Sequence, residues 1–245
     1  MIKEGFKFYK PCKLLQAYVR YYWVFNSCQM MNTYTFPIGC PQIIFHKRTP
    51  LFVPELGTTQ DKLTISGQVN FSSHLQADGN IEMIVVVFYP HTINMFLNTP
   101  ASAFYNKEIS GYDIEDKHLN ELAMQVLECE NNSLCVNLIE KWLLSRLSTR
   151  PYDTTYRVNR MNAAIEKLCT APHTLVTELS SNCCLCKKQF ERVLFACRDE
   201  SQRIFSYCPL SKGIKDNAES AGQDQSSRFG IHKRLCRPIT PHTRI

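Results

Sequence analysis

Long apolar runs are absent from this sequence of 245 residues. The longest, Met83–Tyr89, has the length of one β-strand, and no stretch reaches the roughly 20 apolar residues that a membrane-spanning helix needs. The first residues, MIKEGFKFYKPCK, also lack the apolar segment of a secretory signal peptide. These absences predict a cytoplasmic protein without a membrane partner, in which the twelve cysteines are reduced thiols.

Motifs that organise catalysis are missing as well. His46, His74, His91 and His118 stand singly on different expected elements. No Ser-His-Asp order, glycine-rich phosphate loop or His-x-x-x-His pair accompanies them. We therefore expect neither an enzyme nor a bound cofactor.

One cysteine cluster, Cys183-Cys184-x-Cys186, suggests a zinc site. Structural zinc sites usually combine two pairs of ligands, whereas here the nearest histidine, His173, lies ten residues before Cys183 and no second pair is in register. Small buried or turn thiols are the interpretation that we favour. We expect no metal, and a cysteine-rich metal protein remains an alternative.

Positive charge is unevenly distributed along the chain. Residues 197–245 contain nine of the 28 Lys and Arg residues and five of the 22 Asp and Glu residues. This segment therefore has a net charge of +4, and residues 1–196 have a net charge of +2. Apolar residues in the same segment follow no period of 2 or 3.6, so we expect a disordered tail whose charge gives no independent argument for nucleic-acid binding.

Short strands separated by turn signals dominate the first hundred residues, and helical spacing follows Pro90. The hairpin turn Asp78-Gly79-Asn80 and the strand spacing predict a small β-barrel or sandwich. The expected strands are Tyr18–Phe25, Thr33–His46 (two pieces around Pro37–Gly39), Leu63–Val69, Ser73–Ala77 and Ile81–Tyr89.

Two amphipathic helices should follow, over Lys117–Glu128 and after a capping residue, Ser133. A linker, Ser148–Thr155, leads to a further helix, Tyr156–Cys169. The fold class is therefore α+β. The residues expected to point inward are Leu119, Leu122, Val126 and Leu127, then Leu134, Leu138, Ile139, Trp142 and Leu147, then Val158, Met161, Ile165 and Leu168.

From Thr174 the sequence TLVTELSSNCCLCKKQFERVLF predicts a short helix, a tight turn and a second helix that opens near Lys187. This segment resembles the first helix-turn-helix unit of AraC-type transcription regulators. Cys186 stands where the family usually has a capping Ser, which should weaken the helix start by a fraction of about 1 kcal/mol. The buried positions that the resemblance implies are Leu175, Leu179, Leu185, Phe190 and Leu194.

The resemblance extends towards the N-terminus. The segments that carry it include Tyr22-Trp23, Phe36-Pro37-x-Gly39, Gly67-Gln68 and Val85–Pro90. They are similar to the N-terminal effector or oligomerisation domain of a subset of these regulators.

The family pattern continues in a shifted reading frame. Read from the second base of their codons, residues Arg234–Ile245 permit GYADQSHLIREF, a hallmark of the second helix-turn-helix of the family. The same shift over Cys197–Glu219 permits VGMNPKEFSRIVRFQKALRIMQ, which resembles the end of the first helix-turn-helix and the linker helix after it. Two long matches in one frame and in the right order imply a frame change between about Arg192 and Cys197.

The resemblance thus implies three parts: a sensor or oligomerisation domain over residues 1–150, a mostly helical, truncated helix-turn-helix domain over 151–196, and an out-of-frame, disordered tail over 197–245. The implied partners are promoter DNA, bound weakly or not at all by this chain, an unidentified small-molecule effector and a second copy of the chain. A ligand-binding or protein-interaction module without a DNA role is the alternative. The residues expected to reach DNA are Lys187, Lys188, Gln189 and Arg192.

Overall fold

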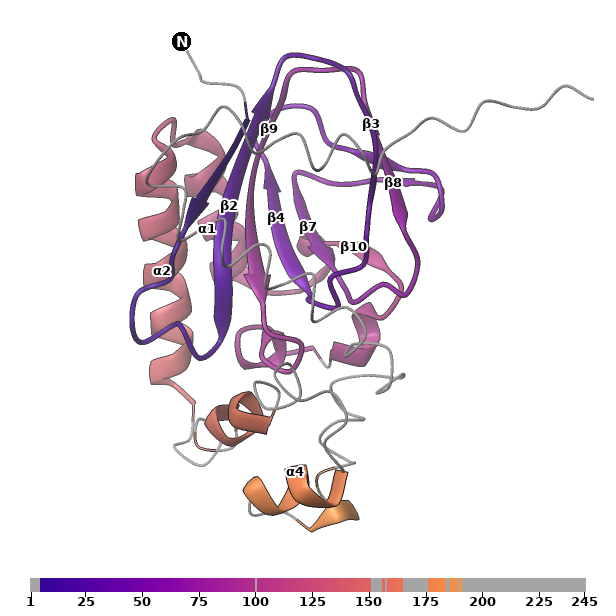
Figure 1. Cartoon of the computed structure of the whole chain (residues 1–245). Helices are drawn as coiled ribbons and strands as arrows, with labels where there is room; N and C mark the ends of the chain where they lie inside the picture. The colour runs from indigo at the N-terminus through magenta and orange to yellow at the C-terminus, as the bar shows by residue number, and fades with distance from the viewer. Residues whose placement is uncertain are drawn as a thin grey trace, which may run out of the picture.

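Strands occupy the first part of the chain and α-helices the second, which confirms the mixed α+β class (Figure 1). The computed structural model describes residues 5–99, 101–150, 156, 158–164, 176–183, 186–188 and 190, so the expected tail lies outside the described residues. The strands are β1 (Gly5–Tyr9), β2 (Val19–Ser27), β3 (Met31–Thr35), β4 (Gln42–His46), β5 (Phe52–Val53), β6 (Thr58–Thr59), β7 (Leu63–Ser66), β8 (Ser73–Ala77), β9 (Ile81–Phe88) and β10 (Glu108–Ser110). The helices are the short η1 (Ile93–Met95), η2 (Ala101–Phe104) and η3 (Gly111–Asp113), then α1 (Lys117–Glu128), α2 (Asn132–Ser148) and α4 (Val176–Asn182), and residues 158–164 are helical too.

The described strands form two antiparallel sheets and no closed barrel. One sheet has the order β1-β2-β9-β4-β7-β10 and the other the order β3-β8-β5-β6. Of the two predicted forms, barrel or sandwich, the barrel is therefore wrong. The two pieces of Thr33–His46 separate after the Pro37–Gly39 turn, since β3 pairs with β8 in the small sheet while β4 pairs with β7 and β9 in the large one.

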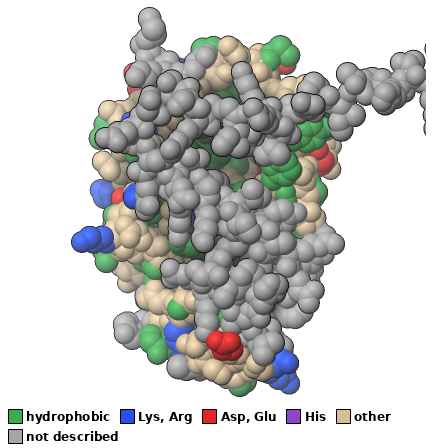
Figure 2. All heavy atoms as spheres, viewed as in Figure 1, with side chains coloured by type: hydrophobic (Ala, Val, Ile, Leu, Met, Phe, Trp, Pro, Cys, Tyr) green, Lys and Arg blue, Asp and Glu red, His purple; other side chains and the backbone are tan. Residues whose placement is uncertain are grey.

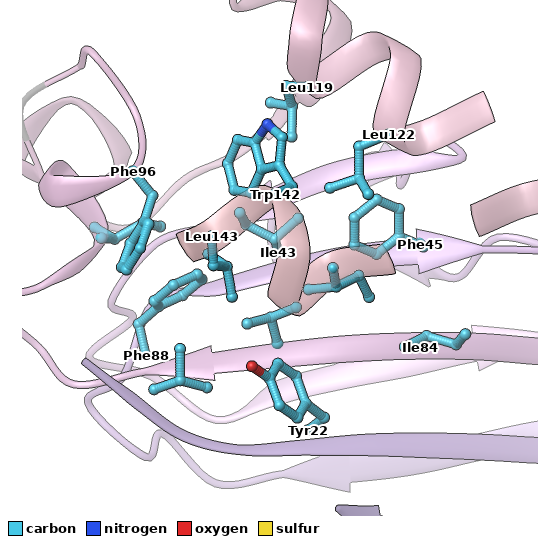
Figure 3. Packing of buried hydrophobic residues seen from close by; sticks show 14 of the residues in the cluster. Tyr22, Ile43, Phe45, Ile84, Phe88, Phe96, Leu119, Leu122, Trp142 and Leu143 are labelled. Carbon is cyan, nitrogen blue, oxygen red and sulfur yellow. The ribbon is translucent and has the colours of Figure 1, made fainter. Parts of the chain in front are cut away.

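The six-stranded sheet lies between the helices and the four-stranded sheet (Figure 1). On its helix side, residues such as Tyr22, Phe45 and Phe88 pack against Leu122 and Trp142 of α1 and α2 (Figure 3). On the opposite side a second apolar cluster joins it to the four-stranded sheet. The members of that second cluster include Ile44, Met83, Val85 and Val87 of the large sheet and Met31, Leu75 and Ala77 of the small one.

Strand β9 contributes to both clusters. All of its residues are buried, and alternate side chains enter opposite cores: Ile84 and Val86 on the helix side, Val85 and Val87 on the other. A strand buried on both faces needs a nearly continuous apolar run, and Ile81–Phe88 supplies it. At the turn before it, Gly79 and Asn80 have positive φ values of 109° and 51°, which confirms a turn at this place. The turn is not the predicted hairpin, because β8 pairs in the small sheet and β9 in the large one, so that it connects the two sheets.

Helix α1 begins and ends where the sequence predicts. The Asp116 carboxylate accepts a hydrogen bond from the Leu119 amide at 3.1 Å and also pairs with Arg146 of α2. Helix α2 differs from the prediction at its start, because Asn131 and not Ser133 is the N-cap. Leu134 is 54% exposed, since the buried stripe of α2 is formed by Cys135, Val136, Ile139, Trp142 and Leu143.

No helix in the described part of the chain has the length and apolar character needed to cross a membrane.

Candidate functional site

The C-terminal described residues have a small core of their own. It joins the helical residues 158–164 to α4 and to the helical residues that follow Cys186. These three segments are here called the helical unit. The burial predicted for Met161, Leu179 and Phe190 is confirmed, with 2%, 1% and 0% of these residues exposed. The other predicted core positions, Ile165, Leu168, Leu175, Leu185 and Leu194, lie outside the described residues.

The second helix of this unit opens at the predicted place. Cys186 is not helical, Lys187 and Lys188 are, and the Phe190 amide donates to the Cys186 carbonyl at 2.9 Å. This is the first hydrogen bond of a helix whose N-cap is Cys186. Both lysines are exposed, as residues that reach DNA must be.

Gln189 and Arg192, the remaining residues expected to contact DNA, lie outside the described residues. In the view of Figure 2, the described Lys and Arg side chains form separate spots at the edge and the lower end of the molecule. The described surface in that view is therefore not a continuous cationic one. Glu178, in the first turn of α4, adds an acidic group to the same small unit.

Cys183 has a packing role in the small core. It is fully buried, and its Sγ donates to the carbonyl of Arg160 at 3.3 Å. Among the residues that the structure describes, no three His, Cys, Asp or Glu side chains lie together as a metal site, and no cysteine forms a disulfide.

Contacts join the helical residues 158–164 to the strand part of the chain. Val158 belongs to the large helix-side core, and the Asn162 side chain donates to the Ala17 carbonyl at 2.5 Å. His91, just after β9, lies beside both residues. Burial lowers the pKa of His91 to about 4, although Val158 and Asn162 favour its protonated form. A short connection thus leads from the central strand to the helical unit.

The face of the six-stranded sheet that looks towards the four-stranded sheet, here called the inner face, carries most of the remaining polar chemistry. Strand pairing places Tyr21, Val87, Gln42, Ser66 and Glu108 in one row across five strands. Directly paired residues point to the same side of a sheet. The row therefore changes from aromatic at β2 to polar at β4, β7 and β10.

A second row on the inner face repeats this change. It runs through Trp23, Val85, Ile44, Thr64 and Ser110, again in direct register. An aromatic wall on one side and polar groups on the other are typical of sites that orient a small organic molecule.

Three residues at the polar side form a hydrogen-bonded chain. The Gln60 carbonyl accepts from His46 Nε2 at 2.7 Å, and the Gln60 amide donates to both Glu108 oxygens at 2.9 and 2.8 Å. Burial raises the pKa of Glu108, and hydrogen bonds from Gln60 and Ser66 oppose that shift. Burial lowers the pKa of His46 to about 4, which leaves its Nδ1 as a buried acceptor without a partner among the described residues.

The buried histidines predict an acid-sensitive fold. A histidine in the unfolded chain has a pKa of about 6.5, whereas His46 and His91 in the folded protein have pKa values of about 4. As the pH falls from 7 to 4, these two histidines therefore bind protons in the unfolded state before they do so in the folded state. We expect each to lower the free energy of unfolding by up to about 1.4 kcal/mol per pH unit in this window. Glu108, whose folded pKa is raised, opposes part of this loss.

Urea unfolding at pH 7.5, 6, 5 and 4.5 measures the effect. His91→Gln should flatten the pH profile relative to the wild-type chain, whereas His118→Gln, on an exposed side chain of α1, should leave its slope unchanged. Equal slopes for all three proteins would contradict the role of the buried His91.

Sequence reasoning missed the inner face almost completely. The strands themselves were expected, but the pairing that places Gln42, Ser66 and Glu108 in one row was not. Strand β10, which carries Glu108, has only three residues and is too short to show an alternation of polar and apolar side chains. Alternating polar residues along β7 could have indicated one polar face.

Comparison with known proteins adds one match. Residues 7–110 match the model of a domain of unknown function, DUF6597. The match covers nearly all of the two sheets and ends before α1. No curated protein and no solved structure matches the chain.

Proposed function

We propose that this chain is an AraC-like transcriptional regulator whose DNA-binding part has been shortened by a frame change. The strand part and helices α1 and α2 form the effector-sensing or oligomerisation domain. The small helical unit is the first helix-turn-helix, and its second helix presents Lys187 and Lys188, followed by Gln189 and Arg192, to DNA.

The observation that carries this proposal is the burial pattern of the helical unit. Leu179 and Phe190 are buried together while Lys187 and Lys188, the first residues of the second helix, are exposed. A helix-turn-helix needs this separation, because one side of the second helix packs on the unit and its first residues enter the major groove.

The contacts between the helical unit and the strand part support a sensing role. Val158 and Asn162 connect the helical unit to Ala17 and to His91 at the end of β9. A ligand that altered the position of β9 would therefore act on the helical unit through direct contacts. Regulation requires that a ligand favour one of two conformations, and the contacts of Val158 and Asn162 at this junction are a place where two conformations can differ.

The inner face favours a second candidate function, a ligand-binding module without a DNA role. Its row from Tyr21 to Glu108 could serve a ligand whatever the state of the helical unit. The two functions are separated by DNA binding, because the module alone has no reason to bind DNA.

Two measurements test the proposal. The coding DNA over residues 190–200 should contain a position where a change of one base opens the frame that encodes the shifted motifs. The chain as given should bind a pool of random-sequence duplex DNA only in the non-specific range, Kd about 10⁻⁴ to 10⁻⁶ M at physiological salt, and select no sequence from it. Absence of any such correction would remove the ancestry on which the proposal depends.

A further inference from the structure

Arg20 is turned towards the inner face by an irregularity in β2. The pairing of β2 with β9 shifts between Val19 and Tyr21, so Arg20 occupies the extra position of a β-bulge. Bulges often redirect a side chain next to a functional site. Here the guanidinium lies 5.9 Å from the centre of the Tyr21 ring and 6.0 Å from that of the Tyr89 ring.

The hydrogen bond from this guanidinium to Cys40 is weak. Arg20 Nη1 donates to the Sγ of Cys40 at 3.1 Å, and thiol sulfur is a poor acceptor. No carboxylate of the described residues pairs with Arg20, although the side chain is half-buried. Arg146, by comparison, pairs with Asp116. A guanidinium that has no carboxylate partner in the described part of the chain and lies in a partly apolar place is suited to a carboxylate, which it can bind through two parallel hydrogen bonds.

An exposed aromatic surface begins beside Arg20. Phe8 packs edge-on against Tyr21 with ring centres 5.7 Å apart, and Phe6 lies 5.4 Å from Trp23 and 4.5 Å from Phe25. Phe6 and Phe8 remain 47% and 48% exposed. Strand pairing puts these rings on the inner-face side of the sheet, because Phe6 is opposite Phe25 and Phe8 is opposite Trp23.

We infer that Arg20 and the aromatic surface of Phe8, Tyr21 and Trp23 form a binding site for a small carboxylic acid with an aromatic or apolar body. Arg20 binds the carboxylate, and the rings cover the body of the ligand. The inference rests on the proposed function in one respect, since it names the chemical class of the effector.

A second copy of the chain is a poorer occupant of this surface. Strands β1 and β2 have the sequences GFKFY and VRYYWVFNS, which contain no acidic residue. Two copies that met through this surface would bring the Arg20 side chains of both together and would not neutralise them. A small anion supplies the missing charge.

Phenylacetate and its neutral counterpart phenylacetamide are matched probes for the full chain. We expect phenylacetate to bind with a Kd of about 1 mM or lower, as is typical for a molecule of this size, and at least about ten times more tightly than the amide. Calorimetry gives the affinities, and a change in tryptophan fluorescence in a Trp142→Phe background locates the ligand at Trp23. The Arg20→Met variant should lose the preference for the acid, whereas Arg48→Met, on an exposed side chain at the other end of β4, should keep it.

Several outcomes would overturn the inference. They are equal binding of acid and amide, unchanged acid binding by folded Arg20→Met, no acid binding by the wild-type chain, and a dimer that dissociates in Phe8→Ser. If Arg20→Met does not fold, Arg20→Lys, which keeps the charge but not the two-pronged geometry, should weaken acid binding several-fold, and unchanged affinity would again contradict the assignment. The titration contains no DNA, so its failure is distinguishable from failure of the proposed DNA-binding function.

Discussion

Restoring the reading frame between about Arg192 and Cys197 should increase affinity for a selected DNA sequence by about a thousandfold or more over the chain as given. Under the proposed function, the repaired chain would gain the linker helix and the second helix-turn-helix, and with them the base contacts of a second major-groove segment. Each good bidentate base contact discriminates by about 1–3 kcal/mol, and each phosphate contact adds released counterions. Sequence selection followed by fluorescence anisotropy at two salt concentrations measures both the base discrimination and the counterion release.

Variants of the repaired chain separate base contacts from phosphate contacts. Gln189→Ala should relax base preference more than it lowers overall affinity, because a glutamine amide can pair with adenine in two-pronged fashion. Lys188→Ala should lower affinity for all sequences similarly and reduce the salt slope by about 1. If the chain as given already binds one sequence tightly and selectively at physiological salt, the frame change is not disabling and this prediction is wrong.

Replacing Gly67 by alanine should destabilise the fold by more than about 3 kcal/mol, within the range of the severest single substitutions. A Cβ at this position would lie 1.6 Å from the carbonyl oxygen of Phe104 and 2.3 Å from its carbonyl carbon. Backbone atoms cannot move aside as a flexible side chain can, and Phe104 is fully buried. The Gly67 amide also donates to the Lys107 carbonyl at 3.0 Å, which holds the two segments together.

Gly57→Ala is the matched control. Nothing lies within 4 Å of a Cβ there, so the substitution should cost only the strain of a positive φ of 63°, about 1–2 kcal/mol. Chemical denaturation of both variants gives the comparison. A Gly67→Ala protein as stable as Gly57→Ala would show that the approach of the Phe104 backbone does not constrain the fold.

Gly67 also shows how far the sequence could predict this fold. The Gly67-Gln68 pair is part of the family resemblance, yet the reason for the glycine is a contact with a residue 37 positions later, which no local pattern reveals. The helical period of Lys117–Glu128 and the continuous apolar run of Ile81–Phe88 were predicted well, because burial sets both patterns. Short strands such as β5 and β10 carry too few residues for such a signal.

The two candidate sites, on the helical unit and on the inner face, also differ in how far the sequence could predict them. The exposure of Lys187 and Lys188 follows from helical spacing within one segment and was predictable. Arg20 could not be identified from the sequence, because its role depends on a bulge and on its closeness to Cys40 and Tyr89 in other segments. Local spacing therefore predicted the helical unit better than the inner face.

The position of β9 determines the order in which the protein can form during synthesis. Its partners β2 and β4 are made first, but they lie on either side of it and cannot join the central sheet until residues 81–88 have emerged from the ribosome. Until then both apolar faces of the large sheet lack their central strand. Pairings this distant in sequence form slowly, because loop closure must precede the contacts that compensate for it. Since β9 completes both cores, the two sheets and the helix layer are expected to fold and unfold as one cooperative unit.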